Sequence, residues 1–553
     1  MIVSGPLLPF AALALPLLLG LLAAVPAMRP RVLMLLPIAP LPALALALSG
    51  PTGEHTELPV LLLGVRLGLD ATGAMFLGAS ALLWALAGVF ATAYMRRTHK
   101  REVFVAFWCL TLTGNLGVFL ARDAVTFYVS FTAVSLPAYL LIVHDATREA
   151  LRAGRIYMIL ALVGETSLLV GLIIACAHAD SLVISQVRDA LADAPGREAA
   201  LALMLIGLGI KAGLVPLHVW LPLAHPQAPT PASAVLSGAI VKAGIFGMLV
   251  LLPAGAGMAN WSLALVAAGL GGAYFGIVAG LGQNGAKAAL AYSTVSQMGL
   301  MIAAAGAAPL ADAPAEFAAV IALYAVHHGL AKGALFMSVG VAGQVNGRAR
   351  HALLAAVALL ALSVAGLPLT GGAVAKTALK SGLEGPAATL VAASAAGTAL
   401  LLLHVWVLLR RSSAHGSRPG RLLWAPFLAA GATALVLPWL LAPAVGVKAS
   451  YVLSAANLWS ATWPLLAAAA IAAAVIGLRI GVPRIPAGDL VVVAERMVPP
   501  AVSRRPAPSH PGPRRGMRRL DPIDRLERGL RRWSTAGPVL LGTAVVLAAL
   551  FLA

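Results

Sequence analysis

The sequence predicts an all-α polytopic membrane protein with about sixteen transmembrane helices. Of its 553 residues, 60% are hydrophobic and 11% are charged, and long apolar runs follow one another almost from end to end. A helix of about 20 apolar residues crosses the hydrocarbon core of a bilayer. Runs of that kind lie near 6–27, 31–49, 69–95, 102–121, 124–143, 156–176, 199–221, 232–253, 261–281, 288–306, 317–343, 352–380, 386–409, 422–444, 462–480 and 537–553.

The distribution of basic residues among the loops fits a membrane topology. There are 39 Lys and Arg residues against 20 Asp and Glu residues, which gives a net charge of +19. If the N-terminus lies outside, the inward loops hold most of the basic residues, as the positive-inside rule requires. We therefore expect a multi-pass protein of the bacterial cytoplasmic membrane with both termini outside. Nucleic acid is not an expected partner, because topology accounts for the charge.

Residues 481–536 interrupt the apolar pattern. The stretch PPAVSRRPAPSHPGPRRGMRRL is rich in Pro and Arg and predicts an extended or disordered cytoplasmic linker. The following stretch, DPIDRLERGLRRW, places Ile523, Leu526 and Leu530 at helical spacing between arginines, which predicts a short amphipathic helix on the inner membrane surface. A charge cluster that stops transfer before the last apolar run explains the same stretch equally well.

Four lysines stand inside otherwise apolar runs. They are Lys211, Lys242, Lys332 and Lys376. A charged side chain near the bilayer centre costs roughly 2.5–3.5 kcal/mol on insertion scales, so such residues usually face a bundle interior. Snorkelling of the side chain to the interface explains one such lysine but not four. We interpret the four lysines as parts of a route for ions through the membrane.

Two of these lysines lie next to predicted helix breaks. Pro216 lacks an amide proton and follows Lys211 closely, so the helix should end just beyond the lysine. Gly366 and Pro368 interrupt the run that carries Lys376. Broken backbone at membrane depth is tolerated only where it is buried in protein or lines a wet cavity. Paired interrupted helices in two halves of a chain point to a transport path.

Polar side chains surround the predicted path. Tyr324, His328 and Lys332 fall at i, i+4 and i+8 and share one helix face, and His327 adjoins them. Histidine titrates near neutral pH and can pass a proton on. Hydroxyl and amide groups that could hold water between titrating sites come from Ser293, Thr294, Ser296 and Gln297, although an isolated Ser or Thr more often bonds its own helix backbone.

Glu165 is the one carboxylate well inside a predicted span. An isolated buried carboxylate is protonated or paired, so we expect a lysine partner, Lys211 by preference. A structural ion pair without a transport role explains Glu165 as well. His218 and His225 flank the first break, and we interpret them as structural or gating side chains rather than relay members.

No cofactor or metal is expected. Cys109 and Cys176 lie in separate spans and lack the spacing of a metal or iron–sulfur site. The sequence contains no P-loop and no CxxC pair.

Four stretches, in this order, resemble the antiporter-like proton-translocating subunits of respiratory complex I. They are GIKAGLVPLHVWLPLAHPQAPTPASAVLSGAIVKAGIFG, LAYSTVSQMGLM, HHGLAKGALFMSVG and AGLPLTGGAVAK. The same fold recurs in membrane-bound nickel–iron hydrogenase complexes and in Mrp-type cation/proton antiporters. The resemblance covers about 69–410, and Ser237 and Lys242 are more similar to the hydrogenase-4 B-subunit branch than to the complex I L-subunit branch.

The resemblance implies two inverted five-helix repeats, each with a broken helix, and a hydrophilic axis in the middle of the membrane. By motif position, Lys211, Lys242, His328, Lys332 and Lys376 match the ion-translocating residues of the family. The resemblance and the composition together divide the chain into six regions. They are N-terminal helices (1–100), a first antiporter-like half (101–255), a second half (256–410), additional helices (411–480), the basic linker (481–536) and a final span (537–553).

The chain departs from the family at one position. In FYVSFTAVSLPAYLLIV, Thr132 stands where the family carries a glutamate that pairs with the lysine of the broken helix. Threonine cannot hold a negative charge. Either Glu165 replaces that glutamate from the neighbouring helix, or the first half is altered or inactive, and both possibilities are open at this point.

We expect the chain to be a subunit of a multisubunit membrane complex that translocates protons, or in second place sodium. Coupling would come from redox or antiport chemistry in partner subunits, since the chain has no redox site of its own. Two alternatives are a scaffold subunit that has lost conduction and an ion-coupled transporter subunit for a small solute or inorganic carbon.

Overall fold

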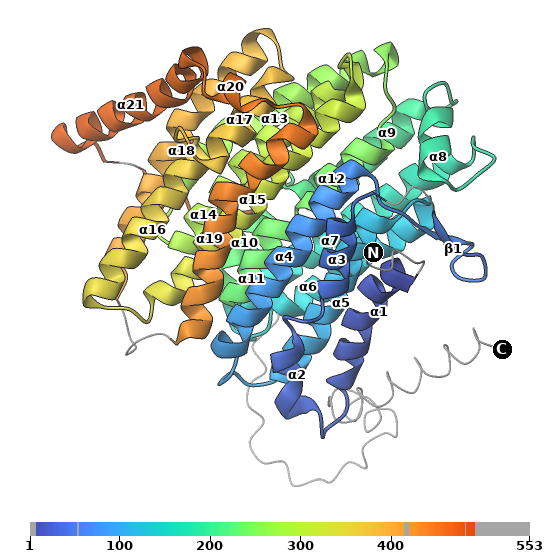
Figure 1. Cartoon of the computed structure of the whole chain (residues 1–553), viewed down its shortest axis with the longest axis horizontal. Helices are drawn as coiled ribbons and strands as arrows, with labels where there is room; N and C mark the ends of the chain where they lie inside the picture. The colour runs from blue at the N-terminus through green and yellow to red at the C-terminus, as the bar shows by residue number, and fades with distance from the viewer. Residues whose placement is uncertain (1–6, 52–54, 414–419, 482, 493–553) are drawn as a thin grey trace, which may run out of the picture.

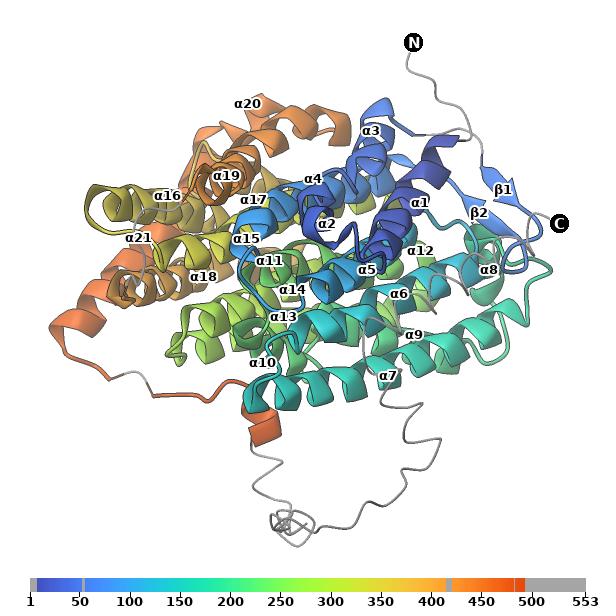
Figure 2. The same cartoon turned by 90° about the horizontal axis from the view of Figure 1, so that it is seen from below.

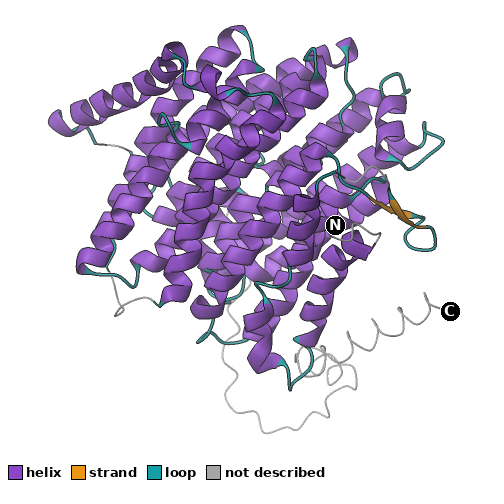
Figure 3. Ribbon diagram, viewed as in Figure 1, coloured by secondary structure: helices purple, strands orange, loops and turns teal. Residues whose placement is uncertain are grey.

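The structure of the chain is a computed structural model that describes residues 7–51, 55–413, 420–481 and 483–492. Figure 1 shows a bundle of long helices that run side by side, with α14 and α15 in its middle. Most of the described chain is helical, and a short hairpin lies at one edge (Figure 3).

The chain begins with short elements. Three short helices and two strands precede the first long helix: α1 (Leu7–Leu22), α2 (Arg29–Leu35), α3 (Leu41–Ser49), β1 (Thr56–Leu58) and β2 (Val65–Leu67). The strands pair antiparallel, with Thr56 opposite Leu67, so the all-α prediction omits this hairpin.

The next part of the chain holds the first broken helix. Its elements are α4 (Ala71–Tyr94), α5 (Arg101–Leu120), α6 (Ala124–Ile142), α7 (Arg148–Cys176), α8 (Ile184–Leu191), α9 (Arg197–Ala212), α10 (Trp220–Gln227), α11 (Thr230–Val235), the π-helical turn η1 (Leu236–Ile240) and α12 (Lys242–Leu251).

The rest of the described chain holds the second broken helix and the peripheral helices. Its elements are η2 (Ala256–Met258), α13 (Ala259–Leu281), α14 (Ala286–Ala307), η3 (Ala308–Leu310), α15 (Pro314–Ala342), α16 (Gly347–Ala365), α17 (Gly371–Ser381), α18 (Gly385–Arg411), α19 (Arg421–Leu441), η4 (Ala442–Val445), α20 (Ala449–Val452) and α21 (Ala455–Gly477).

Side-chain caps begin four of the long helices, and that of α21 is Ser454, whose Oγ accepts from the amide of Asn457 at 3.4 Å. Asp70 accepts a hydrogen bond from the amide of Gly73 at 2.6 Å before α4, and Asp123 accepts one from the amide of Thr126 at 2.7 Å before α6. Thr147 caps α7 through the amide of Ala150. Each cap pairs an amide that the helix itself leaves without a partner.

Twelve helices within the described residues are long and apolar enough to cross a membrane. The sequence predicts sixteen spans, and three of those within the described residues differ. The run 6–27 forms a helix of 16 residues, α1, and the run 199–221 is helical only to Ala212 in α9. The run 31–49 is not one helix but two, α2 and α3, because the turn at 36–40 contains Pro37 and Pro40. The run 537–553 lies outside the described residues.

The two halves share one order of elements. Three long helices precede the break in each half: α5, α6 and α7 come before α9 and α10, and α13, α14 and α15 come before α16 and α17. One further long helical stretch follows each break, α11–α12 in the first half and α18 in the second. The inverted relation between the halves stays a prediction.

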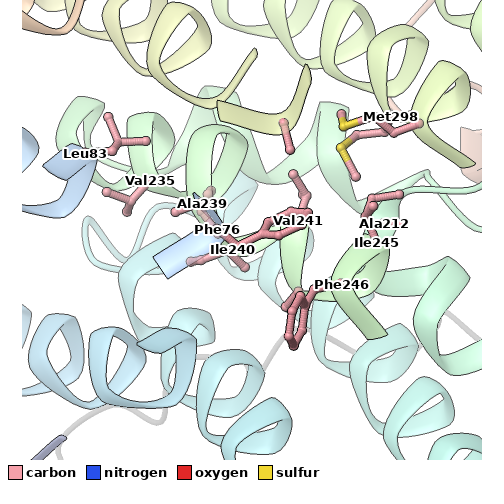
Figure 4. Packing of buried hydrophobic residues seen from close by; sticks show 14 of the residues in the cluster. Phe76, Leu83, Ala212, Val235, Ala239, Ile240, Val241, Ile245, Phe246 and Met298 are labelled. Atoms are coloured by element: carbon pink, nitrogen blue, oxygen red, sulfur yellow. The ribbon is translucent and has the colours of Figure 1, made fainter. Parts of the chain in front are cut away.

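The core lies around α12, α14 and α15. The 18-residue apolar stretches within 286–310 and 314–342 are completely buried, whereas only 11% of the residues in the corresponding stretch of α21 are buried. Figure 4 shows this core, in which Phe76 and Phe246 pack with ring centroids 5.5 Å apart. Phe119 completes an aromatic cluster, 5.2 Å from Phe246. Charged groups on α12 and α15 are therefore held away from lipid.

The described part of 481–536 packs against the bundle. It is therefore not a free linker over residues 483–492. The amide of Ile485 donates to the carbonyl of Gly282 at 3.0 Å, and Gln283 Nε2 donates to the carbonyl of Ile485 at 2.9 Å. Figure 2 shows this segment running from α21 along the edge of the bundle toward α10. The predicted amphipathic helix at 521–533 lies outside the described residues.

Candidate functional site

The first break follows Lys211 directly. Helix α9 ends at Ala212, and Gly213 adopts a positive φ of 79°, which glycine tolerates best. Pro216 lies in the irregular stretch before α10. Trp220 Nε1 donates a 2.8 Å hydrogen bond to the carbonyl of Ile210, which also accepts from the amide of Gly213 at 3.2 Å. Lys211 is thus held on the last turn of a helix inside the bundle.

Lys211 and Glu165 line the same small cavity. Its other walls include Ser135, Tyr157 and Trp220, and both charged residues are buried. The Lys211 ammonium lies 4.4 Å from the ring centroid of Phe131, within the range of a cation–π contact. Glu165 and Lys211 do not form a direct ion pair within 4.0 Å in the described structure, but they interact electrostatically across the cavity.

Thr132 does not line this cavity, although Phe131 and Ser135 from the same helix do. Its Oγ1 is buried and has no hydrogen-bond partner. The carboxylate near Lys211 is therefore that of Glu165, which reaches the cavity from α7 rather than from α6.

A π-helical turn prepares the site of Lys242. At η1 the amide of Val241 bonds to the carbonyl of Leu236, one residue further back than in an α-helix. The carbonyl of Ser237 is left free, and Lys242 Nζ donates to it at 2.7 Å. The turn thereby folds the lysine side chain back along its own helix, in the interior of the bundle.

Lys242 also contacts α15. Its Nζ lies 2.9 Å from Nδ1 of His328. This contact depends on close approach of two backbones: a Cβ added at Gly329 would lie 2.6 Å from the carbonyl oxygen of Gly238. Only glycine at both positions lets the π-helical turn reach the histidine.

Lys332 lies one turn further along α15. Its Nζ donates to the carbonyl of Leu290 on α14 at 2.7 Å, and the side chain is fully buried. It interacts electrostatically with Lys242 and with His328. His225 is buried near the same groups and stacks on Phe336 with ring centroids 4.5 Å apart. Neither nitrogen of the His225 ring has a hydrogen-bond partner.

Hydroxyl and amide groups form two short hydrogen-bonded chains beside the lysines. Ser237 Oγ lies 2.7 Å from Thr294 Oγ1. Tyr324 OH donates to Gln297 Oε1 at 2.5 Å, and Gln297 Nε2 donates to Thr398 Oγ1 at 3.1 Å. Ser293 Oγ, by contrast, is buried without a partner.

The second break holds Lys376. Helix α16 ends at Ala365, Gly366 has a φ of 101°, and Pro368 lies in the irregular stretch before α17. Lys376 is half-buried and donates to the carbonyl of Ala365 at 3.1 Å. His327 links this region to α15, because its Nε2 lies 3.0 Å from Ser363 Oγ and its ring interacts with Lys376.

The predicted residues thus fall into two groups. In one group Lys242 contacts His328, which interacts electrostatically with Lys332 and His327, and His327 interacts electrostatically with Lys376. Lys211 and Glu165 form the other, and no hydrogen bond among the described residues joins Lys211 to Lys242, whose partners are Ser237 and His328.

One contact was missed by the sequence analysis. His218 Nε2 lies 3.1 Å from Asp489 Oδ2, and Tyr292 OH donates to the same oxygen at 2.7 Å. The only sequence signal is the apolar stretch LVVV that follows Asp489 within a basic segment. In the described part of the chain, no group of three or more His, Cys, Asp or Glu is placed to hold a metal ion.

Known proteins are similar to this chain in sequence and in fold. The family described as NADH:quinone oxidoreductase/Mrp antiporter, TM, matches residues 121–401. An uncharacterized protein of Mycobacterium tuberculosis is 35% identical over 342 residues, which cover 58% of this chain and 53% of the relative. Hydrogenase-4 component B of Escherichia coli is 31% identical over 291 residues, which cover 50% of this chain and 43% of the relative. The chain therefore spans about half the length of these curated relatives.

The fold has also been seen in a solved structure. A chain of the Mrp complex from Dietzia sp. superposes with a TM-score of 0.68 at 24% identity, covering 84% of this chain and 99% of that chain. At this level of identity the likeness concerns the fold alone.

Proposed function

Because the chain belongs to the NADH:quinone oxidoreductase/Mrp antiporter transmembrane family, we propose that it is a membrane subunit that translocates protons within a multisubunit complex. Sodium is the second candidate ion. Partner membrane subunits of a complex I-like, hydrogenase or Mrp-type assembly supply the coupling by redox or antiport chemistry. The chain itself supplies the path for the ion.

The proposed path uses lysines and histidines in the middle of the bundle. Ions are taken up from the cytoplasm near the broken helix of Lys211. They pass laterally through Lys242, His328 and Lys332 and leave through Lys376. The orientation follows from the basic loops, which the positive-inside rule places in the cytoplasm.

The observation that carries the proposal is the contact between Lys242 and His328, with Lys332 close by. These three groups are buried, and like charges within a few Å disfavour each other in a low-dielectric site. A proton that binds one of them therefore changes the proton affinity of the others. A purely structural core gains nothing from three such groups.

The test is the variant Lys332→Ala in the purified complex, reconstituted into liposomes. A potassium diffusion potential drives ion movement, and a pH dye inside the liposomes reports it without knowledge of the electron donor. We expect proton uptake to be abolished while the complex stays assembled. Lys448→Ala is the matched control, because Lys448 is exposed in the loop before α20. Uptake at the wild-type rate in an assembled Lys332→Ala complex would refute the proposal.

A second candidate function is a scaffold subunit that no longer conducts. Thr132 favours it, together with the buried Glu165 Oε1 that has no hydrogen-bond partner. The variant Glu165→Gln distinguishes the two functions: slower proton uptake supports conduction through this half, and an unchanged rate supports the scaffold. Glu149→Gln, an exposed position on the same helix, is the control.

A further inference from the structure

Asp489 is a buried carboxylate brought into the bundle by a segment outside the spanning helices. Only 9% of its side chain is exposed. His218 and Tyr292 contact its Oδ2, and the amide of Leu490 donates to its Oδ1. The mechanism proposed above uses neither Asp489 nor His218.

The segment that carries Asp489 packs at a defined position on the bundle. The amide of Ile485 donates to the carbonyl of Gly282, and its carbonyl accepts from Gln283 Nε2. His404 Nε2 lies 2.7 Å from the carbonyl of Gln283. A Cβ added at Gly488 would lie 2.7 Å from the side chain of Leu223 on α10. The segment 483–492 therefore packs on the ends of α13 and α14 and against α10, beside the first break.

Hydrogen bonding determines the charge of the carboxylate. Burial raises the pKa of Asp489, but the hydrogen bonds from His218, Tyr292 and the Leu490 amide outweigh burial and hold the pKa below its ordinary value. The carboxylate is ionised at neutral pH and can only accept. His218 Nε2 must then carry a proton and donate it to Oδ2.

The other ring nitrogen of His218 is consequently a free acceptor in the neutral ring. His218 Nδ1 is buried and has no hydrogen-bond partner. The groups that face this ring are Asp489, Tyr292 and Phe275, whose ring centroid lies 5.0 Å away. Asp489 is the one charged group among them. An unpartnered nitrogen next to a break in the membrane backbone is a place where a proton can bind.

We propose that Asp489 is a positioning residue that makes His218 a proton-accepting group at the break of the first broken helix. The proposal rests on the proposed function, because it adds an uptake site to that path. It also changes our interpretation of His218, which the sequence analysis treated as structural or gating.

The step conserves protons and needs no further reactant. The lone pair of Nδ1 takes a proton from a hydronium ion, which is left as water, and the ring becomes a cation with protons on both nitrogens. The carboxylate of Asp489 offsets that positive charge, as a buried aspartate does for a catalytic histidine. When Nδ1 releases the proton toward the bundle, the ring returns to its starting tautomer.

The experiment compares the pH profiles of proton uptake in liposomes that contain the whole complex. In Asp489→Asn the charge that stabilises the cation is lost, so we expect uptake at neutral pH to fall by at least about fivefold and to recover when the pH is lowered by about one unit or more. His218→Gln should show the same loss without recovery in acid. The double variant should be no slower than His218→Gln, because both residues act in one step. Asp189→Asn, an exposed acid beside Arg188, should keep the wild-type profile.

Three results would overturn the proposal: a wild-type profile in Asp489→Asn, an equal loss at every pH, or a double variant whose loss is the product of the single losses. Should Asp489→Asn fail to assemble, His218→Gln decides, and unimpaired uptake in it refutes the proposal. Lys332→Ala measured in the same liposomes separates the two hypotheses. If Lys332→Ala abolishes uptake and Asp489→Asn behaves as wild type, only the role of Asp489 is wrong.

Discussion

The ammonium group of Lys242 lies 2.9 Å from Nδ1 of His328, deep in the bundle. A charged lysine can only donate hydrogen bonds, so Nδ1 of His328 accepts and its proton resides on Nε2. That nitrogen is buried and has no partner. The pair can therefore exist in two states, with the extra proton on the lysine or on the imidazole, and a neighbouring charge can shift the balance between them.

Replacing Lys242 with Met should stop proton transfer through this pair. Methionine fills a similar volume but carries no proton. It also leaves the carbonyl of Ser237 without its donor, which costs about 1–3 kcal/mol for a buried group. We expect proton uptake in reconstituted liposomes to fall at least about tenfold, with assembly retained on a native gel. Lys448→Met serves as the control. Uptake near the wild-type rate would mean that the pair is structural.

The two breaks illustrate what the sequence can predict. Each break depends on local chemistry, namely Pro216 after Lys211 and Gly366 with Pro368 before Lys376. A proline or a glycine changes the backbone of the helical turn in which it lies, so the break can be predicted without knowledge of the fold. The same locality explains the predicted helix face with Tyr324, His328 and Lys332.

Contacts between distant segments could not be predicted in this way. Lys242 and His328 are 86 residues apart, and His218 and Asp489 are 271 residues apart. The π-helical turn that frees the carbonyl of Ser237 has no sequence signature of its own. The run 31–49 was predicted as one span because hydropathy measures the length of an apolar run. It does not show where a turn that contains proline divides the run into two helices.

Moving the carboxylate back to α6 should restore the pair around Lys211. In Thr132→Glu/Glu165→Gln, a negative charge lies one turn from Ser135, which lines the Lys211 cavity. We expect Glu165→Gln alone to slow proton uptake several-fold, since Lys211 loses its countercharge, and the double variant to regain part of that rate. Thr132→Gln/Glu165→Gln is the control for side-chain volume. No gain over Glu165→Gln would show that the position of the carboxylate matters as well as its charge.

A methyl group at Gly329 should separate α15 from the π-helical turn. The added Cβ would meet the backbone oxygen of Gly238 at 2.6 Å, and backbone cannot rotate away as a side chain can. We expect Gly329→Ala to lower stability by about 1–3 kcal/mol and to slow proton uptake by lengthening the contact between Lys242 and His328. Thermal unfolding of the purified complex measures the first effect. Gly343→Ala is the control, because its nearest atom would lie 3.8 Å away, and equal melting temperatures for both variants would contradict the prediction.

Packing of the segment 483–492 against the bundle, here called its seating, should depend on pH through the protonation of Asp489. Its pKa in the folded protein is below the ordinary value of 3.8, so the unseated segment binds more protons than the seated one as the pH falls. The stabilisation is therefore complete above about pH 5 and is lost progressively below about pH 4. Hydrogen exchange of the Ile485 amide, which bonds to Gly282, reports seating once intrinsic exchange rates are divided out. We expect constant protection from about pH 8 to 5 and a decline in stronger acid. In Asp489→Asn the Ile485 amide should be less protected from exchange at neutral pH, and its protection should not decline in acid. Protection that is already lost between about pH 7 and 5 in the wild type would assign the seating to another group.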